Sequence, residues 1–342
     1  MRVARYYNNS DVRLEEIERP EITDNEILVK VIASGICGSD VMEWYRRNKV
    51  PLVLGHEVAG VVADTGNAVT RYKKGDRITV AHHVPCNTCH YCLRGHHTVC
   101  DTLRQTNFDP GGFAEYLRLP VINVDRGVFL LPDTVTYAEA TFIEPLACVL
   151  RGQRMAHVQP GNSVLVMGSG IAGLLHVQLA RTQGARLVIA TDINDYRLNA
   201  AHKLGADVVL HAGEDVPQRV KEKNNGHLAD VVIVSTGSAA AISQSLQSVD
   251  RGGTVLFFAP TSQGVTIPLS INELFFRNDI TLTTSYAGSP ADYALARDLI
   301  GSGRIKVRDM ITHRLPLAEI GRGFQLVAAA QESLKVILEP QR

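Results

Sequence analysis

The sequence lacks the features that would direct it to nucleic acid or to a membrane. Its 342 residues contain 35 Lys and Arg against 35 Asp and Glu, so no excess of positive charge attracts nucleic acid or anionic lipid. No run approaches about 18 consecutive apolar residues, and the first residues lack the apolar core of a signal peptide. We therefore expect a cytoplasmic protein that acts on small molecules, with no nucleic-acid or membrane partner.

Cysteine is also scarce, and its distribution argues against disulfides. Of six cysteines, four are separated by two, two and seven residues: Cys86, Cys89, Cys92 and Cys100. Four thiolates at this spacing can close a tetrahedron around zinc and leave no open position, which is typical of a structural metal. In a reducing compartment a metal site is favoured over disulfides. The alternatives are an iron–sulfur cluster, or His90, His96 or His97 replacing a cysteine as ligand.

A second set of metal-binding side chains lies nearer the start of the chain. His56 and Glu57 follow the apolar run 50–54, and Cys37 lies in a glycine-containing turn after the strand-like residues 27–32. A thiolate, an imidazole and a carboxylate form the mixed ligand set of a catalytic zinc, at which one position stays open. The alternative is a buried thiol and a hydrogen-bonded core histidine.

The middle of the chain carries a dinucleotide-binding pattern. A strand-like run at 162–167 leads into a glycine turn and a helix at 174–183, and a second strand at 186–191 ends at Asp192. This order of elements predicts that backbone amides at a helix start bind a pyrophosphate. We expect Asp192 to bind the adenosine ribose and to repel a 2′-phosphate, which favours NAD over NADP. The residues expected at the turn and helix start are Gly168, Gly170, Ile171, Ala172 and Gly173.

The remaining patterns indicate two kinds of structure. Short β-branched segments broken by Gly, Pro, Asn and Asp predict a β-rich region up to about residue 120. After residue 160, strands and helices alternate as far as 284, which predicts a parallel sheet with helices on both faces. A chain of this length is expected to form two domains.

A helix-like stretch at 137–153 contains two further candidate ligands. Glu144 and Cys148 are four residues apart, so they share a face of a helix and either could reach the metal. We favour Glu144 and regard Cys148 as a small buried side chain.

Together these motifs resemble the zinc-dependent medium-chain dehydrogenase/reductases, the alcohol dehydrogenase superfamily, over essentially the whole chain. The Gly-His-Glu sequence at 55–57, the Glu-Pro pair at 144–145 and residues 111–116 are most similar to sorbitol-type polyol dehydrogenases and threonine dehydrogenases. The resemblance implies an α/β fold, with a Rossmann doubly wound parallel sheet and a β-rich GroES-like catalytic domain. It further implies a homodimer or homotetramer. The implied domains are 1–152, with the structural zinc lobe at about 86–100, then 153–285 for NAD binding, then 286–342 returning to the catalytic domain.

The resemblance also assigns roles to single residues. It implies that Ser39 hydrogen-bonds the substrate hydroxyl, that Arg197 lies near the adenosine ribose, and that Lys335 lies near the pyrophosphate. Glu144 would be a zinc ligand or the partner of a zinc-bound water, and the choice between Glu57 and Glu144 as the ligand stays open.

The expected activity is the transfer of a hydride between a secondary alcohol and NAD, which yields a ketone. Zinc lowers the pKa of the alcohol, Ser39 accepts the hydroxyl proton, and the hydride passes to the nicotinamide. Many relatives have a proton-relaying histidine at the position of Met42, so the proton must leave here by another route.

The substrate is predicted from the residues that follow the Cys37 turn. A carboxylate and aromatic rings at 43–45 favour a polyol, a sugar alcohol or a sugar acid. The basic residues at 46, 47 and 49 could bind a phosphate or carboxylate, or form a solvated loop. The alternatives are a threonine or amino-alcohol dehydrogenase, a sugar-phosphate dehydrogenase, and a non-catalytic protein that binds zinc and nucleotide. The intact set of Cys37, Ser39, His56 and Glu57 argues against the last.

Overall fold

The computed structural model describes all residues from 1 to 342, and the chain forms two compact units. Unit 1 comprises Met1–Ala147, Ala287–Gly303 and Val307–Arg342, and unit 2 comprises Cys148–Tyr286 and Arg304–Lys306. None of the helices combines the length and the hydrophobicity that a bilayer-spanning helix requires.

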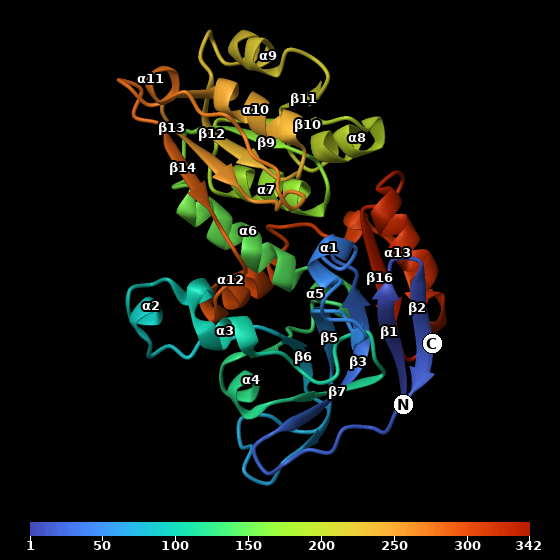
Figure 1. Ribbon diagram of the computed structural model, residues 1–342. Coiled ribbons are helices and arrows are strands. Elements are labelled where there is room, and N and C mark those ends of the chain that lie inside the picture. Colours follow the sequence, from blue (N-terminus) through green and yellow to red (C-terminus); the bar gives the residue numbers. More distant parts are fainter. The chain divides into compact units, whose positions relative to one another are not determined.

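Unit 2 is built on a six-stranded sheet in the order β11-β10-β9-β12-β13-β14, in which every neighbouring pair is parallel. Helices α7 and α8 lie on one side of this sheet, and α9 and α10 lie on the other (Figure 1). The strands are β9 (Ser163–Met167), β10 (Leu187–Asp192), β11 (Val208–His211), β12 (Ala229–Val234), β13 (Val249–Phe257) and β14 (Thr281–Thr284). The helices are α7 (Ile171–Thr182), α8 (Asp195–Lys203), α9 (Val216–Lys223), α10 (Ala239–Ser248) and α11 (Ile271–Leu274). The predicted doubly wound Rossmann sheet is therefore confirmed.

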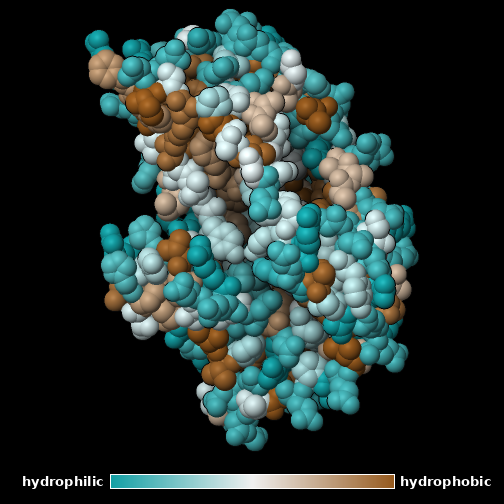
Figure 2. Space-filling model, viewed as in Figure 1, coloured by the Kyte–Doolittle hydropathy of each residue, from teal (hydrophilic) through white to brown (hydrophobic).

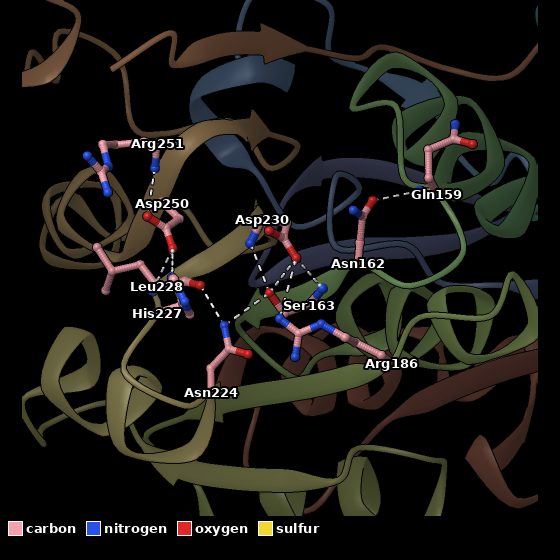
Figure 3. A network of polar contacts seen from close by, with 10 residues as sticks. All are labelled: Gln159, Asn162, Ser163, Arg186, Asn224, His227, Leu228, Asp230, Asp250 and Arg251. Atoms are coloured by element: carbon pink, nitrogen blue, oxygen red, sulfur yellow. Dashed lines mark hydrogen bonds and ion pairs between the residues drawn. The ribbon is translucent and has the colours of Figure 1, made fainter. Parts of the chain in front are cut away.

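The amino ends of two central strands of unit 2 are joined by a partly buried polar network (Figure 3). The Asp230 carboxylate accepts hydrogen bonds from the Ser163 backbone and hydroxyl, both at 2.7 Å. The Ser163 hydroxyl also accepts from the Asp230 backbone N–H at 3.0 Å and from the Asn224 side chain at 3.2 Å. Strands β9 and β12 flank the point where the strand order reverses. In doubly wound sheets, ligands bind outside the carboxyl ends of the strands at such a point, which is the edge opposite this network.

Unit 1 is mainly β structure. A seven-stranded sheet has the order β15-β16-β3-β5-β6-β8, with β7 paired to β3, and a second sheet has the order β2-β1-β4. Its strands are β1 (Arg2–Asn8), β2 (Asp11–Glu16), β3 (Ile27–Gly35), β4 (Leu52–Val53), β5 (Glu57–Thr65), β6 (Arg77–Val80), β7 (Tyr116–Leu119), β8 (Val128–Leu130), β15 (Ile311–Pro316) and β16 (Lys335–Glu339). One core contains Ile27, Val62 and Leu117, and another contains Val3, Phe113 and Phe324. This is the predicted β-rich unit.

The helices of unit 1 are mostly single turns that connect strands. They are α1 (Glu43–Arg46), α2 (His90–Leu93), α3 (Asp101–Gln105), α4 (Val121–Arg126), α5 (Tyr137–Ala140), α12 (Pro290–Gly301) and α13 (Ile320–Ala329), with 3-10 turns η1 (His97–Val99), η2 (Arg308–Met310) and η3 (Leu317–Glu319). The chain passes from unit 1 to unit 2 within α6 (Ile143–Met155).

The stretch expected as one helix at 137–153 is in fact two, α5 and α6. Thr136 begins α5 with a capping box to Glu139. Pro145 lies in the first turn of α6, where its missing N–H costs nothing, whereas one continuous helix would place it in the interior. Glu144 and Cys148 both lie on α6, as predicted.

Candidate functional site

The register of three strands brings distant residues to one place in unit 1. Strands β3 and β5 are antiparallel, and Gly35 at the end of β3 faces Glu57 at the start of β5. Cys37 lies two residues beyond the end of β3, and His56 lies one residue before β5. The two potential ligands therefore meet although 18 residues separate them in the chain.

A glycine makes the approach to His56 possible. Gly55 has a φ of +92°, a backbone conformation that residues with a side chain rarely adopt. A Cβ at this position would lie 2.6 Å from the Phe113 ring. The glycine before the histidine thus allows a sharp turn against a packed aromatic residue. As a result, His56 and Glu57 lie directly after this turn, where β5 begins.

The structure brings three predicted metal ligands together. The sulfur of Cys37, a ring nitrogen of His56 and a carboxylate oxygen of Glu57 all lie within 4.8 Å of one another. Glu144 does not belong to this group; it is buried on α6, with 7% of its surface exposed. The donor set of sulfur, nitrogen and oxygen suits zinc. With three protein ligands, a fourth position would remain open.

Asp40 contacts two of these predicted ligands, and the sequence patterns did not identify it. Its carboxylate is fully buried and accepts a hydrogen bond from the Cys37 backbone N–H at 3.0 Å. The other carboxylate oxygen lies 3.4 Å from His56 Nδ1 and 3.5 Å from an Arg46 nitrogen. A carboxylate that holds one ring nitrogen of a histidine leaves the other for a metal.

The charges of this cluster shift the pKa values of its members. Burial opposes ionisation of both His56 and Asp40, but the pKa of His56 is raised well above its ordinary value because the Asp40 carboxylate and the Cys37 sulfur lie beside it. The pKa of Asp40 is lowered despite burial, because His56 and Arg46 stabilise its anion. Protons and a metal ion therefore compete for His56.

Two further histidines stand beside the group. The His82 ring lies 4.9 Å from the His56 ring and 3.9 Å from the His83 ring. Burial lowers the pKa of His82 far below its ordinary value, and the pKa of His83 falls to about 4, so both are neutral at pH 7. The sequence patterns gave these histidines no role.

Glu57 has a second partner that was not foreseen. Its carboxylate forms an ion pair with the ammonium of Lys335, and both side chains are 1% exposed. Strand β16, which begins at Lys335, pairs with β3 next to β5. This pairing brings Lys335 to Glu57, which is 278 positions away in the sequence. The ammonium balances the charge of the buried Glu57 carboxylate. The role expected for Lys335 near a pyrophosphate stays a prediction.

The four cysteines of the second motif also meet. Their sulfurs lie within 4.8 Å of one another, and none of the six cysteines forms a disulfide. Tetrahedral zinc with Zn–S bonds of about 2.3 Å requires sulfurs about 3.8 Å apart. The separations of 3.6 Å between Cys100 and Cys86 and of 4.0 Å between Cys86 and Cys92 agree with that geometry. No histidine belongs to this group.

Backbone N–H groups favour the thiolate form of one cysteine in this cluster. The N–H groups of Thr88 and Cys89 point at the Cys86 sulfur at 3.5 Å and 3.2 Å, and they lower the pKa of Cys86 to about 5. A thiolate is the form that binds metal. The cluster therefore fits a closed, structural zinc site.

The glycine turn of unit 2 has the form expected for a dinucleotide. Gly168 follows β9 with φ of +94°, and Gly170 is the N-cap of α7, whose first turn contains Ile171, Ala172 and Gly173. No side chain caps this helix start, so its amides remain for an anion.

Asp192 and Arg197 flank this turn. The Asp192 carboxylate accepts hydrogen bonds from the backbone of Ser169 at 2.8 Å and of Asn194 at 3.0 Å. An Arg197 nitrogen would lie 3.8 Å from a Cβ built on Gly170, and its buried Nε has no partner. An unsatisfied buried donor beside a helix start that no side chain caps fits an anionic ligand.

Comparisons with known proteins agree with this architecture. Residues 23–132 match the model of the alcohol dehydrogenase GroES-like domain, and residues 172–302 match that of the zinc-binding dehydrogenases.

The chain is also similar to proteins along its full length. It is 32% identical to the sorbitol dehydrogenase of Bacillus subtilis (strain 168), over 100% of this chain and 98% of the relative. It is 34% identical to the L-threonine 3-dehydrogenase of Bacillus velezensis, over 99% and 98%. A crystal structure of a putative zinc-binding dehydrogenase from Sinorhizobium meliloti, bound to NADP, superposes with a TM-score of 0.88 at 30% identity and covers 99% of both chains. The chain therefore belongs to the zinc-dependent medium-chain dehydrogenase/reductase family, as its motifs predicted, and it is an oxidoreductase.

Proposed function

We propose that this protein oxidises a secondary alcohol of a polyol, sugar alcohol or sugar acid to the ketone, with NAD as the hydride acceptor. The observation that carries the proposal is the group formed by Cys37, His56 and Glu57, with the Ser39 hydroxyl 3.4 Å from the Cys37 sulfur. The same chain has a dinucleotide-binding fold with an acidic residue at the end of β10. The names of the relatives, sorbitol dehydrogenase and L-threonine 3-dehydrogenase, support alcohol oxidation.

The ligands we propose for the catalytic zinc are Cys37, His56 and a carboxylate. Glu57 is favoured by its place in the group, although Lys335 shares its carboxylate. Glu144 is the second candidate and is buried in the same unit. A zinc ion held by these residues supplies Lewis acidity that lowers the pKa of an alcohol hydroxyl. For the second ion we propose Cys86, Cys89, Cys92 and Cys100 as ligands.

Ser39 is the residue that receives the hydroxyl proton in this proposal. Its backbone N–H and its hydroxyl both lie 3.4 Å from the Cys37 sulfur, so the hydroxyl is held at the edge of the ligand group. Met42 is the N-cap residue of α1 and offers no group that carries a proton. We therefore assign the onward route to Glu144 or to the ribose hydroxyls of the cofactor. Asp40 keeps Cys37 and His56 oriented throughout.

For the cofactor we propose NAD, which accepts the hydride. Asp192 would bind the adenosine ribose, Arg197 would lie beside it, and the amides from Gly170 to Gly173 would bind the pyrophosphate. Lys335 remains a proposed contact of the pyrophosphate, although its ammonium has Glu57 as a partner. We also propose a cytoplasmic location, because four cysteines that could hold zinc suit a reducing compartment.

The activity is tested by the absorbance of NADH with zinc-replete protein and a panel of polyols, aldonates, sugar phosphates and threonine. We expect turnover with at least one polyol or aldonate, and loss of about 10²-fold or more in kcat/KM for Cys37→Ser, because that substitution removes a ligand sulfur. The matched control is Cys148→Ser, which should keep most of the activity. No turnover with any alcohol would refute the proposed function, and activity confined to threonine would refute the substrate class.

The preference for NAD follows from the position of Asp192. A 2′-phosphate would place negative charge beside a buried carboxylate, so kcat/KM with NAD should exceed that with NADP by at least about 10-fold. Asp192→Ser should reduce this ratio, whereas Asp195→Ser, on the exposed start of α8, should not. Equal efficiencies of the wild-type protein with both cofactors would contradict the assignment.

The two proposed zinc sites should differ in lability. A closed cluster of four thiolates holds its ion more tightly than a site with an open position, so a mild chelator should remove one ion and the activity before the structure is lost. Asp40→Asn should weaken the labile site about 10- to 100-fold and leave the other unchanged. Metal analysis during chelation, followed by circular dichroism, measures both effects. A single zinc per chain would contradict the account.

We also propose that a second copy of this chain associates with unit 2. β14 is at the edge of its sheet, and the neighbouring residues Leu269, Ile271 and Phe276 are 42%, 65% and 67% exposed. Figure 2 shows hydrophobic surface around α11, where these residues lie. An open edge strand next to exposed apolar side chains is suited to a symmetric contact. Light scattering should report a dimer or tetramer that Phe276→Glu weakens. A wild-type monomer at micromolar concentration would refute this.

A further inference from the structure

Arg46 lies beside Ser39 and Asp40, next to the group formed by Cys37, His56 and Glu57, and its side chain is not in a solvated loop. Its side chain is 13% exposed. Its Nε lies 3.3 Å from the Ser39 carbonyl oxygen, and one terminal nitrogen lies 3.4 Å from the Ser39 hydroxyl and 3.5 Å from Asp40. The guanidinium is therefore next to the hydroxyl that we propose contacts the substrate.

Part of the donor capacity of Arg46 is unused. A guanidinium offers five N–H donors, and the three contacts of Arg46 are all longer than the usual range of about 2.7–3.2 Å. They involve Nε and Nη2, whereas Nη1 has no hydrogen bond or ion pair in the structure. The two N–H groups of Nη1 can still donate to an anion.

The positive charge of Arg46 is only partly balanced by its neighbours. The Asp40 carboxylate is shared between Arg46 and His56 and is inaccessible to a ligand. The Lys49 ammonium and the Arg46 guanidinium lie 4.6 Å and 4.8 Å from the centre of the Tyr45 ring. Both cations contribute to the low pKa of His83, after burial and the charge of His56.

The acidic residue of the same helix faces elsewhere. Glu43 accepts a hydrogen bond from the Asn9 backbone at 2.9 Å. With Arg47 it lines a separate hollow of about 350 Å³ that also contains Tyr6 and Tyr7. Arg46 is therefore the charged residue of α1 that lies beside Ser39.

A second polar atom near this group has no protein partner. The Nδ1 of His82 is buried and makes no hydrogen bond, although the His82 ring lies 4.9 Å from the His56 ring. Buried polar atoms are nearly always paired in folded proteins, so an unpaired one beside His56 is available to a water or to a polar ligand. A neutral imidazole can donate to an oxygen of that ligand.

We propose that Arg46 binds a carboxylate of the substrate, and that the substrate is a hydroxy acid whose carboxylate lies one or two carbons from the carbinol. The proposal rests on the proposed function, because it takes Ser39 as the contact of the reacting oxygen. Since the guanidinium lies 3.4 Å from the Ser39 hydroxyl, an anion that it binds must be close to that oxygen. This selects aldonates and similar sugar acids from the wider class of polyols.

The test compares alcohols that differ only in the carboxylate. The pairs are glucitol with gluconate, propane-1,2-diol with lactate, and butane-1,3-diol with 3-hydroxybutyrate, each measured with NAD. We expect the acid of at least one pair to have the higher kcat/KM. Arg46→Met should reduce the value for that acid about 10- to 100-fold, mainly through KM, and reduce the value for its neutral partner less. Arg46→Lys should lose less than Arg46→Met, because lysine keeps the positive charge but lacks the planar set of N–H donors.

Arg47→Met is the matched control, because Arg47 is exposed and lines the other hollow. It should leave the acid-to-neutral ratio unchanged. A readout without turnover is calorimetric titration of gluconate and glucitol into the zinc-replete protein with NADH, in which Arg46→Met should weaken gluconate selectively.

Three results would overturn the inference: preference for the neutral alcohol in every pair, equal loss for both members in Arg46→Met, or a stronger preference for glucose 6-phosphate. Absence of turnover with every alcohol would instead refute the proposed function. In that case, selective weakening of gluconate binding by Arg46→Met would still support the carboxylate site, and its absence would overturn it.

Discussion

The candidate site depends on the balance of buried charges. Asp40 and Glu57 are carboxylates removed from water, and an isolated buried carboxylate is strongly unfavourable. Asp40 is offset by His56 and Arg46, and Glu57 is offset by Lys335. Because breaking such a pair costs about 3–5 kcal/mol, each charge holds its partner in one position. The same pairs orient the proposed ligands, so stability and the proposed function would depend on the same contacts.

The sheet of unit 1 explains why these charges meet. Strand β3 pairs with β5 on one side and with β16 on another, so the end of β3, the start of β5 and the start of β16 come together. A one-residue slip of β5 would turn Glu57 to the opposite face. In unit 2 the corresponding constraint is the parallel order of strands, which exposes one helix start beside Asp192.

Much of this could be predicted from the sequence, because the signals are local. The glycine turn, Asp192, the cysteine spacing and the Gly-His-Glu sequence are short patterns whose geometry is fixed by neighbouring residues. The family and the fold class were predicted correctly for that reason. The break in the helix at 141–142 was also predictable, since Pro145 needs a helix start. The partner of Lys335 was not predictable, because Glu57 is 278 positions away in the sequence. The roles of Asp40 and Arg46 likewise depend on the folding of the Cys37 loop against β5, which no periodic pattern encodes.

The claim that Cys37 and His56 form a reaction centre is tested most directly by anomalous X-ray diffraction at the zinc absorption edge, from crystals of the purified protein with NAD. The account predicts two peaks per chain, one bonded to the Cys37 sulfur and a His56 nitrogen and one among the four cysteines from Cys86 to Cys100. The first peak should also show which carboxylate, that of Glu57 or that of Glu144, completes the site. A fully zinc-loaded crystal with no peak at Cys37 and His56 would contradict the account.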